Sequence, residues 1–490
     1  MELTPEQQNA VASRAAITLV KASPGSGKTR TALARYLAYL AEGGIAKDAV
    51  ILTFTTAGAL EFGSRLEPLE VPSPGFMGTL HAYALSRLQR IRELSGLPAF
   101  TVLDEETVEK RLKAMAESMQ IKVPLSQIKE FLSVENPGIA NKAAIVAGKW
   151  RKHCLSTGEI DFDTILVLFL LELKKGGHRA IKLLIVDEYQ DSAAIDAMIY
   201  AEMDAEYLFV VGDADQSIFG FRGARQENII ELEQVEGVNV CSLSVNFRSG
   251  EAIIRAARNL ISKNSYNFGS NMVGTGESAT VRLIRPPSEN VQLTALIEWA
   301  MQRPPNQTAV LCRLNSTLQM LRPAFAAMMG IQQRQEADPL VSMALQAAMR
   351  LVAHKIPIER AGQFLTTSKV PLQVVRFLHS LGTDEPGVMV AKLQAMTREE
   401  SNAGDGVFLG TMHSAKGREW DHVAIADAVQ SCCPGGKEGK DLEAERRLFY
   451  VGITRARTEL VLSAPQLWTP PFCRGAIDVE PSQFISELSA

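Results

Sequence analysis

Two short apolar runs, each followed by acidic residues, constrain the fold of this 490-residue chain more than any other feature. The first reads IKLLIVDEYQD (181–191) and the second reads YLFVVGDADQ (207–216). A run of Leu, Ile and Val that ends in Asp is typical of a buried parallel strand, which delivers a carboxylate to the carboxyl edge of its sheet. Because open α/β sheets bind ligands at that edge, we expect Asp187 and Glu188 to form a pair of a metal-binding and a water-activating carboxylate. Three polar residues are expected beside them: Gln190, Asp215 and Gln216.

The segment near the amino terminus predicts the phosphate end of the same site. The apolar run AITLVK (16–21) is followed at once by ASPGSGKT (22–29), which fits the P-loop pattern with alanine at the first position. Glycines in such a loop let backbone N–H groups curl around phosphate oxygens. Lys28 would reach the terminal phosphates, and the Thr29 hydroxyl would bind Mg²⁺. The predicted nucleotide-binding residues of this segment are Ala22, Ser23, Pro24, Gly25, Ser26, Gly27, Lys28, Thr29 and Arg30.

A helix is expected directly after this loop, because its positive end must face the phosphates. An apolar helical face supports this prediction, and Gly43 and Gly44 would end the helix. The face consists of Ala32, Leu33, Tyr36, Leu37 and Leu40. Together with the acidic pair, these features predict Mg²⁺-dependent hydrolysis of a nucleoside triphosphate. A small-molecule kinase or a GTPase would share this much of the pattern.

The rest of the chain carries further motifs. In order, the motifs are LTPEQQNAV (3–11), ASPGSGKT (22–29), TFTTAGALEFGSRL (53–66), GTLHAYAL (78–85), VDEYQD (186–191), VGDADQSIFGFRGA (211–224), SVNFRSGEAI (244–253), VFLGTMHSAKGREWDHV (407–423) and EAERRLFYVGITRAR (443–457). With these motifs in this order, the chain resembles superfamily 1 DNA helicases of the UvrD/Rep/PcrA type. The resemblance implies ATP as the nucleotide, Mg²⁺ as the cofactor, and single-stranded DNA and DNA junctions as partners.

The resemblance also implies a role for each residue of the ATP site. Arg248 in NFRS and Arg455 in ITRAR match two arginines that stabilise charge on the γ-phosphate, and both would act across a cleft. The implied catalytic set is Lys28, Asp187, Glu188, Gln216, Arg248 and Arg455, with Gln216 as the γ-phosphate sensor. Thr29 and Asp187 would hold the metal ion, and Glu188 would orient or deprotonate the attacking water. Three residues match contacts to the nucleoside: Gln8 and Phe247 to adenine, and Glu419 to the ribose.

Sequence-independent binding of a single strand requires aromatic platforms and a basic groove. The residues that match strand contacts of the family are Phe54, Thr55, His81, Phe219, Phe221, Arg222, His413 and Lys416. Core packing explains Phe54 as well as base contact does. Phe219 and Phe221 directly follow the sensor residues, which favours base contact for both.

Two stretches depart from the family pattern. The motif TFT is usually continued by asparagine, lysine and alanine, whereas this chain has Thr56-Ala57-Gly58-Ala59 and so lacks one polar and one basic strand contact. Arg418 and Trp420 stand where leucine and phenylalanine are favoured. The tryptophan is an aromatic exchange, but the sequence offers no physical reason for the arginine.

Composition restricts the class of protein only broadly. The net charge of −4 excludes a globally basic nucleic-acid binder but not a protein with a locally basic groove. The longest apolar run, 165–171, is far too short to span a bilayer. The six cysteines show no metal-ligand spacing, which fits a reducing cytoplasm. We therefore expect a cytoplasmic protein with no membrane partner.

The motifs predict an α/β fold with two RecA-like parallel-sheet P-loop NTPase cores, each interrupted by a mostly helical insertion. The first core would comprise 1–84 and 178–244, with an insert at 85–177. The second core would comprise 245–330 and 405–480, with a reduced insert at 331–404 and a tail at 481–490. Helical periodicity in VEKRLKAMAESM (108–119) and KAAIVAGKWRKH (142–153) supports the first insert.

Two functions fit these observations. The first is an ATP-dependent DNA helicase or translocase, for which the resemblance implies 3′→5′ movement and duplex separation. The second is a DNA-sensing ATPase subunit that unwinds little and partners a separate nuclease, in repair or phage defence. A repair or replication protein is a further possible partner. A kinase or GTPase explains neither the paired arginines nor the adenine-type contacts.

Overall fold

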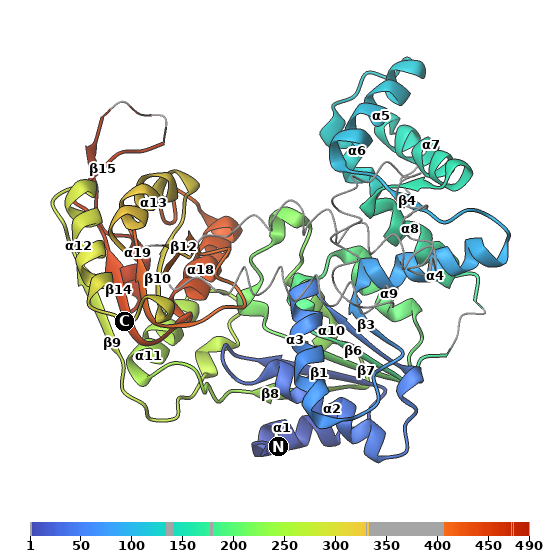
Figure 1. The fold of residues 1–490 in the computed structure, drawn as a ribbon, viewed down its shortest axis with the longest axis horizontal. Helices are drawn as coiled ribbons and strands as arrows, with labels where there is room; N and C mark the ends of the chain where they lie inside the picture. Colours follow the sequence, from blue (N-terminus) through green and yellow to red (C-terminus); the bar gives the residue numbers. More distant parts are fainter. Residues whose placement is uncertain are drawn as a thin grey trace, which may run out of the picture. The chain divides into compact units, whose positions relative to one another are not determined.

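The computed structural model describes residues 2–133, 141–176, 180–329, 331–332, 406–471, 473 and 475–489. The chain forms two compact units, and each contains a six-stranded parallel sheet (Figure 1). The first unit comprises Met1–Arg248 and Ile261–Thr275, and the second comprises Ser249–Leu260 and Gly276–Ala490. The predicted α/β class with two parallel sheets is confirmed. The domain limits expected from the motifs stay predictions beside this division.

The sheet of the first unit has the strand order β3-β2-β6-β7-β1-β8. Its strands are β1 (Ile17–Ala22), β2 (Ala49–Thr53), β3 (Phe76–Thr79), β6 (Leu183–Val186), β7 (Tyr207–Gly212) and β8 (Val238–Leu243). All neighbouring pairs are parallel, so the carboxyl ends of the six strands share one edge. The two apolar runs that precede acidic residues in the sequence are β6 and β7, which pair directly with each other.

Both faces of this sheet are buried, which explains why its strands are apolar at successive positions. Successive side chains of a strand point to opposite faces of the sheet. Leu184 therefore belongs to one large core cluster, whereas Ile185 belongs to a second cluster. The second cluster includes residues of α2 (Lys28–Ala41), among them Ala32, Leu33 and Tyr36 of the predicted helical face. The other helices close to this sheet are α1 (Pro5–Ala12), α3 (Thr56–Leu66), α9 (Ala194–Glu202) and α10 (Glu227–Glu233).

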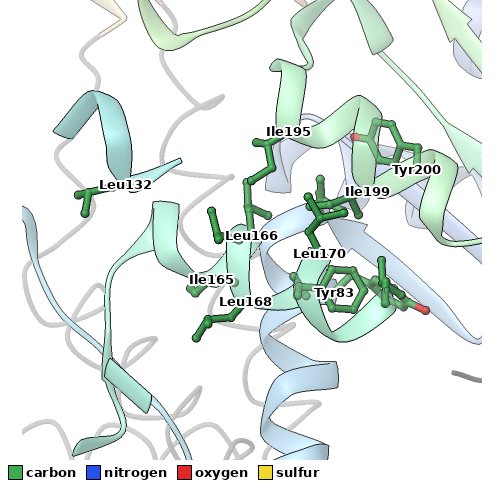
Figure 2. Packing of buried hydrophobic residues seen from close by; sticks show 14 of the residues in the cluster. Tyr83, Leu132, Ile165, Leu166, Leu168, Leu170, Ile195, Ile199 and Tyr200 are labelled. Carbon is green, nitrogen blue, oxygen red and sulfur yellow. The ribbon is translucent and has the colours of Figure 1, made fainter. Parts of the chain in front are cut away.

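The chain between β3 and β6 forms a mostly helical insert, as predicted (Figure 1). It contains α4 (Leu80–Leu94), α5 (Glu105–Ser118), α6 (Leu125–Leu132), α7 (Lys142–Thr157) and α8 (Phe162–Leu173), with the short strands β4 (Thr101–Val102) and β5 (Glu159–Ile160). Helix α8 is apolar on nearly all sides because it packs between other helices of the insert, α4 and α6, and helix α9 beside the sheet. Figure 2 shows Leu166 and Leu170 of α8 close to Ile195 and Ile199 of α9.

The sheet of the second unit has the order β11-β12-β10-β13-β14-β9, again with all pairs parallel. Its strands are β9 (Thr280–Ile284), β10 (Thr308–Cys312), β11 (Ile331–Gln332), β12 (Val407–Thr411), β13 (Trp420–Ile425) and β14 (Ala456–Ser463). Among the residues that the structure describes, its helices are α11 (Glu251–Ile261), α12 (Glu289–Met301), α13 (Asn315–Met329), α18 (Gly439–Ile453) and α19 (Gln483–Glu487). A short antiparallel pair, β15 (Leu467–Trp468) and β16 (Ile477–Asp478), follows β14.

Two of the predicted segments, the reduced insert and the tail, are not described in full. The reduced insert at 331–404 lies outside the described residues, apart from β11. The predicted tail at 481–490 contains α19, whose Phe484 is buried against Phe449 of α18. Within the parts of the chain that the structure describes, no helix is both long enough and apolar enough to cross a bilayer.

Candidate functional site

The P-loop lies between the carboxyl end of β1 and the first turn of α2. Gly25 and Gly27 both have positive φ, 67° and 83°, a region that favours glycine. Space also requires glycine here, because a Cβ on Gly25 would lie 2.7 Å from Arg248 Cβ and one on Gly27 would lie 2.7 Å from Gln7 Nε2. The loop is therefore enclosed closely by side chains from two distant parts of the sequence.

The acidic pair follows β6, as the sequence predicts. Asp187 is buried, and its Oδ2 accepts a hydrogen bond of 3.2 Å from the Thr29 hydroxyl. Burial and the neighbouring charge of Glu188 raise the pKa of Asp187 to about 7. Two hard oxygen ligands thus converge at the end of the P-loop, which is the ligand type that Mg²⁺ prefers. Thr29 and Asp187 fit a magnesium site.

Glu188 has an unusual backbone conformation. Its φ of 57° places a non-glycine residue in the left-handed region, where backbone strain is stored. Its side chain accepts a hydrogen bond from Gln190 Nε2, and Gln190 Oε1 accepts one of 2.8 Å from the backbone N–H of Asp213. Gln190 therefore joins the loop after β6 to the loop after β7 and fixes the orientation of Glu188.

The loop after β7 reaches back to the P-loop lysine. Asp213 Oδ2 lies 4.0 Å from Lys28 Nζ and accepts a hydrogen bond of 2.5 Å from Gln216 Nε2. Burial raises the pKa of Asp213, and the charge of Lys28 opposes that shift. Lys28, Asp213 and Gln216 therefore form a connected polar group at the phosphate end of the site.

The nucleoside end contains one residue that the sequence argument did not identify. Gln8 is exposed, and its side chain donates to the carbonyl of Leu3. Its neighbour Gln7 is buried and donates from Nε2 to the carbonyl of Ser26 in the P-loop, 3.0 Å away. Neighbouring residues of a helix point about 100° apart. Helix α1 thus brings Gln7, and not Gln8, to the P-loop.

The segment after β8 is attached to the P-loop by hydrogen bonds to backbone carbonyls of the loop. Asn246 Nδ2 donates to the carbonyl of Pro24 at 2.8 Å, and the Phe247 N–H donates to the carbonyl of Gly25 at 3.0 Å. These bonds place Phe247, which is 52 % exposed, and Arg248 beside the P-loop within the first unit. Arg30 extends in another direction and donates to the carbonyl of Glu2.

An aromatic group follows the same edge of the first sheet. The rings of Phe54 and Phe219 stack with centroids 5.6 Å apart, and the ring of Phe221 contacts Phe219 edge-on at 6.0 Å. Phe221 is 71 % exposed, whereas Phe54 and Phe219 are half-buried. The Thr55 hydroxyl accepts from the Gly58 N–H and so caps α3. Arg222 ends the short 3₁₀ turn Gly220–Arg222.

A second aromatic contact lies within the helical insert. His81, at the start of α4, meets Phe162, at the start of α8, with ring centroids 5.8 Å apart. Phe162 is 59 % exposed although it is a large apolar residue, and burial lowers the pKa of His81. Phe162 is not among the residues predicted from the sequence, because its place at the start of a long apolar helix gives little signal of exposure.

In the second unit, Arg455 is almost fully buried, with 1 % exposure. Its guanidinium donates to the carbonyl of Val451 at 2.9 Å, to the carbonyl of Arg418 at 3.2 Å and to the Thr454 hydroxyl at 3.2 Å. Glu419 is paired with Arg457 at 2.5 Å, and the Glu419 hydrogen bond raises the pKa of Arg457. These hydrogen bonds hold the predicted phosphate and ribose contacts within their own unit.

The loop after β12 carries His413 and Lys416. Burial lowers the pKa of His413 to about 4, and the charge of Arg313 adds to the effect. His413 is therefore a neutral ring near pH 7. The structure also supplies a reason for Arg418: its guanidinium lies over the ring of Phe408 at 4.9 Å, and Phe408 stacks on Trp420 at 4.6 Å.

The first sheet and its P-loop after β1, with an acidic pair after β6 of the same sheet, define a P-loop nucleoside-triphosphatase. The comparison with known families specifies this class. Residues 3–235 match the UvrD/REP helicase N-terminal domain, and residues 387–466 match the UvrD-like helicase C-terminal domain. The chain belongs to the UvrD/Rep family of helicases.

The chain is similar to several proteins along almost its whole length. It is 24 % identical to the ATP-dependent DNA helicase UvrD2 of Mycobacterium tuberculosis, over 99 % of this chain and 81 % of that protein. It is 23 % identical to the ATP-dependent DNA helicase PcrA of Bacillus subtilis, over 99 % of this chain and 85 % of that protein. With Rep of Escherichia coli the identity is 30 %, over 59 % of this chain and 48 % of that protein. The PcrA alignment extends over 639 positions for a chain of 490 residues, so that relative carries segments that this compact chain lacks.

Proposed function

We propose that this protein is an ATP-driven motor that moves 3′→5′ along single-stranded DNA and separates duplexes ahead of it. One observation carries the proposal. A single loop after β7 contains both Gln216 and Phe219. Gln216 donates a hydrogen bond to Asp213, the carboxylate near Lys28, and Phe219 stacks on Phe54. Few residues separate the phosphate end of the site from the aromatic group, so a change at the phosphates reaches the bases through a short path.

The residues of the first unit divide the hydrolysis between them. Lys28 and the P-loop N–H groups bind the phosphates, and Thr29 and Asp187 hold Mg²⁺, which neutralises phosphate charge when bound. Glu188, fixed by Gln190, orients the attacking water and accepts its proton. Gln216 senses the γ-phosphate. Phe247 stacks on the adenine, and we assign the reading of its edge to Gln7 in place of Gln8, because Gln7 is the residue that lies at the P-loop.

Two arginines would stabilise the charge of the transferring γ-phosphoryl group. Arg248 lies beside the P-loop already, whereas Arg455 is buried in hydrogen bonds to backbone carbonyls of its own unit. Binding of ATP would exchange those carbonyl partners of Arg455 for phosphate oxygens. Glu419 would likewise leave Arg457 to contact the ribose.

The strand would lie over the aromatic residues of the first unit. Phe54, Phe219 and Phe221 would offer stacking surfaces, and the pair of His81 and Phe162 would add a further aromatic surface on the helical insert. Thr55, Arg222, His413 and Lys416 complete the proposed strand contacts. His413 would act as a neutral ring and not as a cation, since burial lowers its pKa.

Two measurements test the proposal. The first is the rate of ATP hydrolysis with and without single-stranded DNA, which we expect to rise strongly with DNA. A rate that neither DNA nor RNA changes would remove the basis of the motor. The second is unwinding of duplexes with a 3′ or a 5′ single-stranded tail, for which we expect activity on the 3′ tail. Preference for the 5′ tail would overturn the direction.

The second candidate is a DNA-sensing ATPase that partners a separate nuclease and unwinds little. Thr56-Ala57-Gly58-Ala59 favours it, because α3 begins there without the polar and basic side chains expected for strand contact. A protein of this kind would show DNA-stimulated hydrolysis but no strand displacement from a 3′-tailed duplex when assayed alone. Strong displacement by the purified chain would exclude it.

A further inference from the structure

One segment of the chain returns to the first unit after the chain has left it. The chain enters the second unit at Ser249, forms most of α11 there, and returns for Ile261–Thr275 before it continues into β9. We call Ile261–Thr275 the strap. A segment that leaves α11 and is held on another unit must owe its position to contacts with that unit, and the structure shows these contacts in detail.

Two parts of the strap are attached to segments other than the loop after β7. Tyr266 donates a hydrogen bond of 3.2 Å to Glu233, which also pairs with Lys21 of β1 at 2.5 Å. The Lys21 ammonium in turn lies over the Phe268 ring, 5.3 Å from its centroid. At the far end, the Val273 N–H donates to the carbonyl of Ser244 at 2.9 Å, which extends the pairing beyond β8.

The middle of the strap is attached to the loop after β7 that contains Gln216, which we call the sensor loop. The backbone N–H of Gly269 donates a hydrogen bond of 2.6 Å to Asp215 Oδ2. Asp215 is fully buried, and its own backbone N–H donates to Asp213 Oδ1 at 3.1 Å. A hydrogen bond to a buried carboxylate is short and strong, because the surroundings screen it poorly. Asp215 therefore holds the strap and the sensor loop at a fixed separation.

Asp215 directly precedes Gln216, the residue hydrogen-bonded to Asp213 opposite Lys28. Asp215 and Gln216 are consecutive residues of the short 3₁₀ turn Ala214–Gln216, so a displacement of Asp215 moves the backbone that carries Gln216. The position of the strap is thereby transmitted to the Gln216 amide within one residue. Neither Asp215 nor Gly269 needs to touch the nucleotide for this to hold.

We propose that Asp215 is a positioning residue, which places Gln216 for hydrolysis by fastening the sensor loop to the strap through Gly269. The strap then makes the sensor responsive to α11, the element of the second unit from which the strap begins. The inference rests on the proposed function, because it assumes that Gln216 acts on the γ-phosphate.

The first test replaces Asp215 by Ala and by Asn in the full chain. Asp215→Ala removes the acceptor, and we expect the DNA-stimulated kcat for ATP to fall roughly 10- to 100-fold, as small misplacements of catalytic groups do, with KM for ATP changed less than about twofold. Asp215→Asn keeps an oxygen at the same place, so it should restore most of the rate. The matched control is Tyr266→Phe, which removes a strap hydrogen bond that does not involve the sensor loop and should leave the rate near that of the wild type.

A double-mutant cycle separates positioning from general damage. If Asp215 acts through Gln216, then Asp215→Ala should lower the rate less than about twofold when Gln216→Ala is already present. An equal loss in both backgrounds would overturn the proposal, as would failure of Asp215→Asn to restore the rate. Failure of the proposed function gives a different result, because the wild-type rate would then not respond to DNA at all.

Hydrogen exchange of the wild-type protein provides a second test, which holds even if Asp215→Ala does not fold. We expect a non-hydrolysable ATP analogue to slow exchange in peptides covering 261–275, since the analogue fixes Gln216 and thereby the strap. Peptides of the surface helix α5 serve as the reference. Unchanged exchange in the strap, with clear protection in the P-loop, would contradict the proposal.

Discussion

The two sheets hold the proposed site residues in different surroundings. Those of the first sheet follow the carboxyl ends of its strands, whereas Glu419 and Arg455 directly precede β13 and β14. In the first unit, Thr29 and Asp187 already converge, and Lys28 already lies near Asp213. In the second unit, Arg455 is buried in hydrogen bonds to carbonyls, and Glu419 is paired with Arg457. The groups of the first unit therefore lie next to one another at one site, whereas Arg455 and Glu419 are bonded to other residues of the second unit.

This difference has a physical cause. A P-loop offers backbone N–H groups, which strand and helix geometry position without side-chain partners. An arginine near a protein interior must be hydrogen-bonded, since an unpaired buried guanidinium would be costly. The guanidinium of Arg455 has such acceptors in the carbonyls of Val451 and Arg418. The following variants test this contrast between the two sites.

The largest effect is expected for the proposed ATP site of the first unit. Glu188→Gln removes the base and should lower ATP turnover by about 10⁴-fold, the upper end for loss of a general base. DNA binding should persist, because the aromatic residues are unchanged. Turnover of radiolabelled ATP and fluorescence anisotropy of a labelled oligonucleotide measure the two properties. Glu206→Gln, the same exchange at a surface residue paired with Lys182, is the control. Near-normal turnover of Glu188→Gln would refute the site assignment.

Loss of either Arg248 or Arg455 to Ala should lower turnover by roughly 10³-fold, the lower end for an arginine finger. Arg455→Ala should also lower the melting temperature, because it leaves the carbonyls of Val451 and Arg418 without this donor. Differential scanning calorimetry beside the ATPase assay checks both expectations. A melting temperature of Arg455→Ala equal to that of the wild type would show that these hydrogen bonds contribute nothing to stability.

A smaller effect is expected at the aromatic group of the first unit. Phe219→Ala removes a ring that stacks on Phe54 and should weaken binding of a single-stranded oligonucleotide by about 1–3 kcal/mol. Titration of a fluorescent oligonucleotide at fixed salt measures the affinity. Ile45→Ala, which shortens an exposed apolar side chain away from the aromatic group, provides the comparison. Identical affinities for the two variants would assign Phe219 to packing alone.

The smallest effect concerns stability of the second sheet. Burial would raise the pKa of Glu459, but hydrogen bonds and charges of Arg303 and Arg282 outweigh it and lower the pKa to about 2. A lowered folded-state pKa stabilises the fold above the ordinary value of 4.5, and the contribution is lost as the pH falls from 4.5 through 2. Glu459→Gln should lower the melting temperature by roughly 2–4 °C at pH 7 and by less at pH 3. A difference that stays constant with pH would contradict the ion-pair origin.

Much of the first unit follows from residues close in sequence. The predicted strand at 16–21 is β1, Ile17–Ala22, and the predicted helix face at 32–40 lies on α2. The acidic pair after 181–186 occupies the carboxyl end of β6 as expected. These features depend on local patterns, namely apolar runs, glycine spacing and helical periodicity, which a sequence displays directly.

Other features were beyond such patterns. Gln7 and Gln8 are equivalent in the sequence, yet only the direction of α1 relative to the P-loop selects Gln7. Arg418 acquires a reason only when β12 brings Phe408 beneath its guanidinium. The strap was not anticipated, because its contact with Asp215 joins positions 54 residues apart through one backbone N–H.

The sequence by itself determined the chemistry of this protein: a P-loop, an acidic pair, a sensor loop and two arginines in an order that defines the family. Tertiary structure alone decided which of these groups lie ready and which are held by other partners. The reason is that strand ends and glycine loops position backbone groups locally, whereas the partner of a buried side chain depends on which distant segment packs beside it. The hydrogen bonds of Arg455 to carbonyls and of Asp215 to the strap are both contacts of this kind.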